Sequence, residues 1–275
     1  MNQSAFEVRP MSAAIGARIH GVDLSQPLDE DTVAAIRRAW LEHLVLFFPD
    51  QELTPRQQLD FARCIGEPMA YPFVKGLPEL PLITAVVKLE HETRNFGGIW
   101  HSDTAYLSAP PMATLLLARE LPAKGGDTLF ANMYLAYESL SGGMRNLLDG
   151  LIAVNSSLKA DASATREDRL GSDGRDDAPE LLEAEHRVVR VHAETGRKAL
   201  FVNVGHTSHF EDMTVAESRP ILEFLFEHLR QPEFCCRFQW SVGALALWDN
   251  RCAQHYPVND YHGSRRVMHR ITLRG

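Results

Sequence analysis

The chain has 275 residues, 45% of them hydrophobic, which is enough for a sizeable core in one large or two small domains. Its formal net charge is −8, so it lacks the basic footprint that nucleic-acid binding requires. No apolar run approaches the roughly 18 residues that span a membrane, and no signal-peptide pattern opens the sequence. We therefore expect a cytoplasmic protein that binds neither nucleic acid nor membranes.

The first third of the chain predicts two helices with a strand between them. Asp29 can cap a helix with apolar residues at near-helical spacing, and residues 45–48 form an apolar run of strand length. Thr54 and Pro55 combine a cap with a proline in the first helical position, and Gly66 is a typical C-terminal stop. A second short helix is expected there.

Strand-like runs dominate from about residue 80 onward. The expected strands are 82–89, 113–118, 128–131, 188–192, 199–203, 236–240, 244–248 and 267–273. The turns 194–197 and 241–243 are each expected to close a hairpin. Two helices interrupt the strands, one over 134–148 and one opened by the capping-box pair Thr214 and Glu217. The pattern predicts a mainly β protein with flanking helices (α+β), built on a double-stranded β-helix, or cupin-like jelly roll.

No internal repeat divides the sequence, so we expect a single domain over residues 1–275. One segment, 159–185, is rich in aspartate and glutamate and contains no aromatic residue. Such a composition cannot bury much apolar surface. We expect a mobile, lid-like surface insert there, with a solvated loop of no function as the alternative.

The best local constellation for chemistry is His101 and Asp103. Residues two apart in an extended segment project to the same face, so this pair can offer a nitrogen and an oxygen to one metal ion. The pair alone is weak, and a polar loop is the simpler interpretation. His255 is a candidate third ligand, because a jelly roll brings distant strands together. Two histidines and a carboxylate form the facial triad of non-haem Fe(II) oxygenases.

The last strand carries two arginines on one face. Strand alternation places Arg266, Met268 and Arg270 on the same side. A buried arginine needs an anionic partner, so this face is suited to holding a carboxylate and a second anion. Pairing of both arginines with surface carboxylates is the alternative.

Four motifs together resemble a known family. They are WHSD at 100–103, GGDT at 125–128, WDNR at 248–251 followed by His255, and RVMHRIT at 266–272. In this order they look like the taurine dioxygenase and 2,4-dichlorophenoxyacetate dioxygenase (TauD/TfdA) family of Fe(II)/2-oxoglutarate enzymes. The resemblance covers nearly the whole chain.

The resemblance implies a site for each cofactor. His101, Asp103 and His255 would be the catalytic Fe(II) ligands, and Thr128 with Arg266 would bind the distal carboxylate of 2-oxoglutarate. The reaction implied is hydroxylation by O2, with succinate and CO2 as co-products. Because Asp103 is retained as a ligand, hydroxylation is favoured over halogenation.

The substrate implied is a small organic anion: a sulfonate, sulfate ester, carboxylate or phenoxy acid. Arg270 matches the arginine that grips the substrate anion in the family, and Thr104 is a further candidate for substrate contact. Tyr71, Gly97 and His206 stand where the taurine enzymes carry histidine, asparagine and phenylalanine. Taurine itself is therefore not the expected substrate.

Two rival functions use the same residues. A zinc hydrolase or lyase could employ the two histidines and the carboxylate, and a non-catalytic cupin-like protein could use the arginines to bind an anion. Dependence on 2-oxoglutarate separates both from the dioxygenase. The resemblance also suggests a homo-oligomer, either a dimer or a tetramer.

Overall fold

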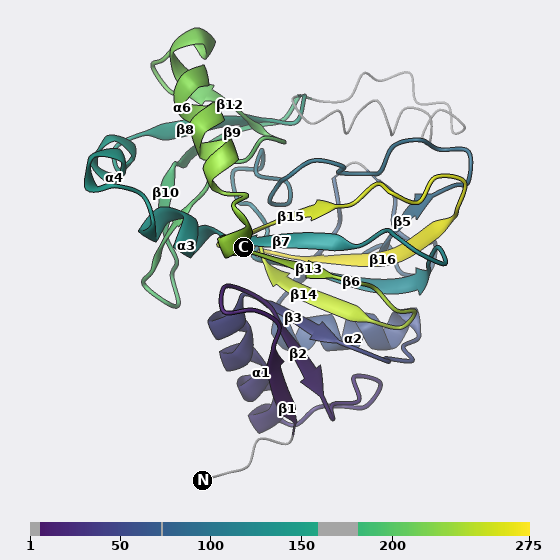
Figure 1. Cartoon of the computed structure of the whole chain (residues 1–275). Coiled ribbons are helices and arrows are strands. Elements are labelled where there is room, and N and C mark those ends of the chain that lie inside the picture. The colour runs from purple at the N-terminus through teal and green to yellow at the C-terminus, as the bar shows by residue number, and fades with distance from the viewer. Residues whose placement is uncertain (1–5, 73, 159–180) are drawn as a thin grey trace.

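The structure is a computed structural model that describes residues 6–72, 74–158 and 181–275. Its helices are α1 (Glu30–His43), α2 (Pro55–Ile65), α3 (Met133–Glu138), α4 (Gly142–Leu148), α6 (Val215–His228) and the short 3-10 helix η2 (Pro232–Phe234). Its strands are β1 (Glu7–Pro10), β2 (Ala17–His20), β3 (Val45–Phe48), β4 (Pro68–Met69), β5 (Thr84–Lys88), β6 (Ala113–Glu120), β7 (Thr128–Asn132), β8 (Ile152–Ser156), β9 (Glu183–Arg187), β10 (Val189–Val191), β11 (Lys198–Leu200), β12 (Thr207–Phe210), β13 (Cys235–Phe238), β14 (Leu245–Asp249), β15 (Ala253–Pro257) and β16 (Arg266–Leu273). Figure 1 shows their arrangement.

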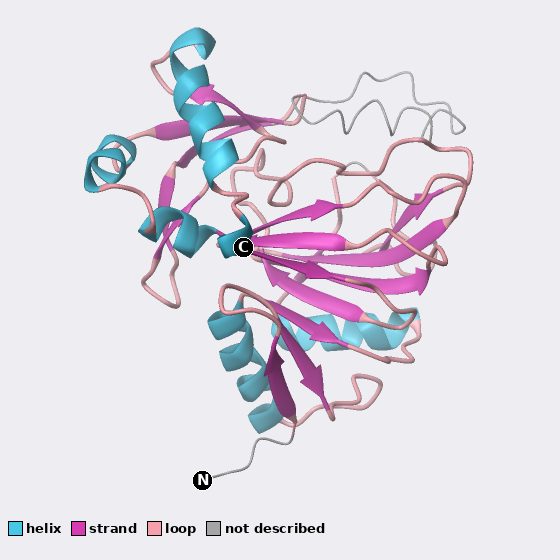
Figure 2. Ribbon diagram, viewed as in Figure 1, coloured by secondary structure: helices cyan, strands magenta, loops and turns pink. Residues whose placement is uncertain are grey.

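A main sheet of eight strands and a smaller sheet form the core. The main sheet has the order β1-β2-β3-β14-β6-β16-β4, with β5 also paired to β16, and the smaller sheet has the order β13-β7-β15. In Figure 2, helices α1 and α2 lie on the side of the main sheet away from the smaller sheet. A further sheet, β12-β8-β9, and the hairpin β10-β11 lie beside this core with α6. This mainly β, jelly-roll architecture confirms the expected fold class.

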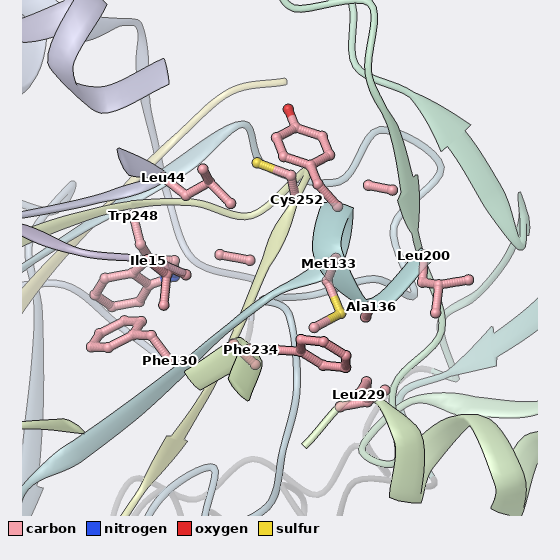
Figure 3. Packing of buried hydrophobic residues seen from close by; sticks show 14 of the residues in the cluster. Ile15, Leu44, Phe130, Met133, Ala136, Leu200, Leu229, Phe234, Trp248 and Cys252 are labelled. Atoms are coloured by element: carbon pink, nitrogen blue, oxygen red, sulfur yellow. The ribbon is translucent and has the colours of Figure 1, made fainter. Parts of the chain in front are cut away.

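The two faces of the main sheet carry different apolar side chains, because the side chains of each strand point alternately to one face and the other. Leu245 and Leu247 of β14 belong to the cluster that contains Trp40 of α1 and Leu59 of α2. The alternate residues Ala246 and Trp248 belong to the other cluster, with Phe130 of β7, and Figure 3 shows Trp248 and Phe130 packed against each other. One face of the sheet therefore packs on helices, and the other faces the smaller sheet.

Both early helices begin where the sequence predicts. The side chain of Asp29 accepts a hydrogen bond from the Thr32 amide at the start of α1. Thr54 forms a capping box with Gln57 at the start of α2, and Gly66 ends this helix. These local hydrogen bonds satisfy amides that the first helical turn leaves without a partner.

Three expectations need correction. The helix expected over 134–148 is two helices, because Ser141 caps a new one, α4. The turn 241–243 does not close a hairpin: β13 pairs with β7, whereas β14 pairs with β3 and β6. Residues 183–185 of the expected insert lie in β9, which pairs with β8.

The part of that insert from 159 to 180 lies outside the described residues, so its expected role as a lid is untested.

The other hairpin, at 194–197, is confirmed by antiparallel pairing of β10 with β11. Among the described residues, no helix has both the length and the apolar character needed to cross a bilayer.

The stacked pair Phe47 and Phe238 provides a test of this core. Phe47 is fully buried and its ring lies 3.9 Å from that of Phe238. Phe47→Ala should lower the free energy of unfolding by about 3–5 kcal/mol, because it leaves a cavity. Urea denaturation measures this. Phe224→Ala, at a side chain that is 45% exposed, is the matched control and should cost far less; equal losses would contradict the assigned core.

Candidate active site

His101 and His255 are held side by side by the backbone. The two residues form an isolated antiparallel bridge, in which His101 N–H donates to His255 O (3.1 Å) and His255 N–H donates to His101 O (2.9 Å). Their ring centroids are 4.2 Å apart. Asp103 Oδ1 lies 3.7 Å from His101 Nε2 and 4.0 Å from His255 Nε2. The three predicted ligands therefore present one atom each to a common point.

Hydrogen bonds orient these ligand atoms. Ile99 O, which can only accept, lies 2.7 Å from His101 Nδ1, so Nδ1 carries the hydrogen and Nε2 keeps its lone pair. Thr114 Oγ1 donates to Asp103 Oδ2 (2.6 Å) and accepts from Asn250 Nδ2 (3.0 Å). Asp103 Oδ1 thereby faces the two imidazoles, where a metal ion could bind it. Such hydrogen bonds to ligand residues fix their orientation and tune a metal site.

Charge and burial set the protonation of the three ligands. Burial alone would raise the pKa of Asp103, but Arg270, then His255 and His101, outweigh it and hold this pKa well below its usual range. Burial lowers the pKa of both histidines. An ionised carboxylate and two neutral imidazoles are the forms that bind a metal ion.

The loop at Gly97 lies close against His101. Gly97 has φ +66°, and a Cβ built on it would lie 2.9 Å from His101 Cε1. A side chain here would require the imidazole or the loop to shift, in a backbone conformation that favours glycine.

A small cavity joins the three ligands to the other end of the site. It has a volume of about 50 Å³ and is lined by the triad together with Thr128, Arg266 and Arg270. Trp240 Nε1 donates to Thr128 Oγ1 (2.9 Å), which leaves the hydroxyl hydrogen of Thr128 free to donate. Within the described part of the chain, Nε and Nη2 of the buried Arg266 have no hydrogen-bond partner. A buried guanidinium in this state is suited to an anionic ligand.

A larger cavity of about 410 Å³ opens from the triad toward solvent. All four predicted substrate residues line it: Arg270, Tyr71, His206 and Thr104. The guanidinium carbon of Arg270 lies 4.5 Å from the centroid of the Tyr71 ring. Arg270 Nη2 lies 3.0 Å from Asp103 Oδ1, as an ion pair.

His206 and Thr104 line the same cavity near His101 and Asp103. The His206 ring lies 4.9 Å from the ring of Tyr106 and 5.9 Å from that of His101. Thr104 is buried and has φ +44°, an uncommon conformation for a residue with a Cβ. Tyr106 and Arg94 also line the cavity, and no sequence pattern indicated either of them.

A second cluster of metal-binding residue types is already satisfied by hydrogen bonds. His192, Asp249 and Cys252 lie close together, but both Asp249 oxygens accept hydrogen bonds from Arg251. His192 Nδ1 accepts from the Glu194 and Thr195 amides, so its Nε2 carries the hydrogen and donates to Asp249 Oδ2 (3.0 Å). We therefore assign a structural role to this hydrogen-bonded cluster.

The hydrogen bond to Asp103 yields a testable prediction. Thr114→Val removes the donor to Oδ2 and should lower divalent-metal affinity about 10- to 100-fold, the usual effect of losing a hydrogen bond to a metal ligand. Titration of the metal-free variant with Fe(II) measures this. Thr32→Val, in α1 on the helix-covered face of the main sheet, serves as the control. Unchanged affinity in Thr114→Val would contradict the orienting role.

Comparisons with known proteins agree with this geometry. A model of the family described as "Taurine catabolism dioxygenase TauD, TfdA family" matches residues 7–272. The chain is 36% identical to the alpha-ketoglutarate-dependent sulfate ester dioxygenase of Pseudomonas putida, over 98% of this chain and 90% of that protein. It is 32% identical to the alpha-ketoglutarate-dependent 2,4-dichlorophenoxyacetate dioxygenase of Cupriavidus pinatubonensis, over 96% of each.

Solved structures give the same result. The crystal structure of a taurine dioxygenase from Burkholderia xenovorans matches with a TM-score of 0.82 and 36% identity, over 98% of this chain and 91% of that one. The structure of AAD-2 in complex with Mn(II) and N-oxalylglycine matches with a TM-score of 0.83 and 27% identity, over 98% of each chain. With this family match over residues 7–272 and these relatives, the chain belongs to the TauD/TfdA family of Fe(II)- and 2-oxoglutarate-dependent dioxygenases.

Proposed function

We propose that this dioxygenase hydroxylates a small organic anion held by Arg270, with Fe(II) bound by His101, Asp103 and His255. The observation that carries the proposal is the shared cavity, which has the triad at one end and the unpartnered guanidinium atoms of Arg266 at the other. A dicarboxylic keto acid needs both features at once.

The residues present fit both cofactors. Two imidazole nitrogens and one carboxylate oxygen form the donor set of non-haem Fe(II) oxygenases. The buried Arg266 guanidinium and the Thr128 hydroxyl offer charge-assisted hydrogen bonds to a carboxylate. When bound, Fe(II) and 2-oxoglutarate supply the oxidative chemistry, in which O2 is consumed, succinate and CO2 are released and one oxygen atom enters a substrate C–H bond.

The chain's own residues position the substrate. Arg270 lies between the triad and the Tyr71 ring, so an anion bound to its guanidinium lies beside the metal site. Tyr71 and Tyr106 give the cavity aromatic walls, while His206 adds a polar group. A group bound by Arg270 is thereby oriented with its carbon chain in the larger cavity.

Among the anions considered, a sulfate ester is the one to test first. Two relatives carry this chemistry in their names: the sulfate ester dioxygenase, and an alkylsulfatase of Acinetobacter baylyi that is 35% identical over 98% of this chain. Hydroxylation of the carbon that bears the sulfate oxygen gives an unstable product that collapses to an aldehyde and inorganic sulfate. Sulfonates, carboxylates and phenoxy acids are the comparison panel.

The two rival functions receive less support. A zinc hydrolase or lyase does not require a buried arginine at the Arg266 end of the cavity. A passive anion-binding protein does not require an oriented triad. Family membership also favours the dioxygenase over both. The cytoplasmic location and a dimeric or tetrameric state stay predictions.

Loss of a metal ligand tests the reaction class. His255→Ala should reduce substrate-dependent succinate formation to background, because it removes one of three ligands. Succinate and O2 consumption are both measured, with His209→Ala, at a half-buried residue of β12, as the control. Near-normal turnover in His255→Ala would overturn the triad assignment.

Replacement of Arg270 tests the substrate site separately. Arg270→Met should raise the KM for the anionic substrate at least about 10-fold, since a charge-assisted hydrogen bond contributes about 1.5–3 kcal/mol. The anaerobic Fe(II)–2-oxoglutarate charge-transfer band should still form, but substrate should no longer perturb it. Arg274→Met, at an exposed arginine just after β16, is the control. An unchanged KM in Arg270→Met would exclude Arg270 as the anion site.

A further inference from the structure

Two buried cations lie directly opposite each other across a strand pair. Strand β5 runs antiparallel to β16, as Figure 1 shows, and Lys88 is the register partner of Arg266. Directly opposed residues of an antiparallel pair project to the same face of the sheet. Lys88 is only 3% exposed and Arg266 6%. The face that carries Arg266 therefore also carries a second buried positive charge.

Both cations contact the same aromatic ring. Lys88 Nζ lies 4.1 Å from the ring centroid of Tyr261, and the Arg266 guanidinium carbon lies 6.0 Å from it. Lys88 Nζ also donates to the Tyr261 carbonyl (3.4 Å). Lys88, Tyr261 and Arg266 line a common cavity of about 10 Å³, which is the size of one water molecule. The ammonium group is therefore close to the Arg266 end of the site.

No close ion pair neutralises these charges among the described residues; Glu92 attracts Lys88, and Asp127 attracts Arg266, only from a longer distance. Over the described ranges 6–72, 74–158 and 181–275, no carboxylate forms an ion pair with Lys88 or with Arg266. Asp127, the acid that follows the two glycines of the GGDT motif, accepts instead from Arg237 (2.6 Å). Like charges directly opposite each other are destabilising in a sheet, and burial adds to that cost. An anion from outside the chain would offset it.

We propose that Lys88 is a specificity-determining residue that, with Arg266, makes the site select a keto acid with a second, distal carboxylate. The inference rests on the proposed function, in which that carboxylate binds at Arg266. Lys88 acts as a positioning residue: its charge attracts the distal carboxylate from behind the Tyr261 ring, and it takes no part in the reaction. The positive charge of Lys88 destabilises the free protein and stabilises the complex with the distal carboxylate, and both effects are electrostatic.

A pair of ligands separates this role from simple packing. 2-Oxopentanoate has the same chain as 2-oxoglutarate, with a methyl group in place of the distal carboxylate. Both offer the same keto-carboxylate group to Fe(II). The dissociation constant of each is measured anaerobically from the charge-transfer band of the Fe(II) enzyme, so no turnover is needed.

Lys88→Met keeps an unbranched side chain, one atom shorter, and removes its charge. It should raise the dissociation constant of 2-oxoglutarate about 10-fold or more, while that of 2-oxopentanoate changes little. The metal-free variant should be no less stable in urea than the parent, because a repulsion between like charges has been relieved. Lys88→Arg should keep the preference for 2-oxoglutarate, and Lys88→Gln repeats the test if the methionine variant does not fold. Lys198→Met, at an exposed ion pair with Asp149, is the matched control.

Two results would overturn the inference. Equal loss of affinity for both keto acids would mean that Lys88 only supports packing, and unchanged affinity for both would mean that it does not sense the distal carboxylate. Failure of the proposed function has a different outcome: the parent enzyme itself would give no charge-transfer band with 2-oxoglutarate, and both proposals would fall.

Discussion

The active site depends on two main-chain hydrogen bonds, those that join His101 to His255. They tie a loop in the first half of the chain to β15 near its end, and they place both imidazoles on one side of the junction. Asp103 follows two residues later and completes the set of ligands. Because these bonds involve only backbone atoms, they hold the ligand positions whatever the neighbouring side chains are. Thr114 and Asn250 then set the rotation of the carboxylate.

The site is a cationic cavity inside an acidic protein. The chain carries a net charge of −8, yet Arg266, Arg270 and Lys88 are all buried on the inner side of two neighbouring strands. The opposite face of the main sheet is apolar and packs on α1 and α2. Positive potential is thus concentrated where anions bind, and the low-polarity surroundings strengthen it.

Local patterns predicted the parts of the site that alternate along one strand or lie two residues apart. The two arginines of β16 and the pair His101–Asp103 are examples, and the expected jelly roll, followed by the family resemblance, indicated His255. Lys88 could not be found in this way, because its relation to Arg266 is a register between strands far apart in sequence. The donor Trp240 was missed for the same reason.

The wrong predictions about secondary structure have a similar origin. The turn 241–243 has the composition of a hairpin, but the strands on either side of it pair with different partners. Apolar residues continue through 134–148 and suggest one helix, whereas the cap at Ser141 divides it. A turn can be recognised from its local sequence, whereas the pairing partner of a strand depends on the whole sheet.

Gly97 has a consequence for how this enzyme could change its substrate range. Any side chain at this position would meet the imidazole of His101, and the left-handed backbone there adds a second penalty. Substitution in the wall of the cavity at Gly97 is therefore restricted to residues that tolerate a left-handed backbone. Variation that broadens or narrows the choice of substrate meets less resistance at Tyr71 and His206, which line the same cavity.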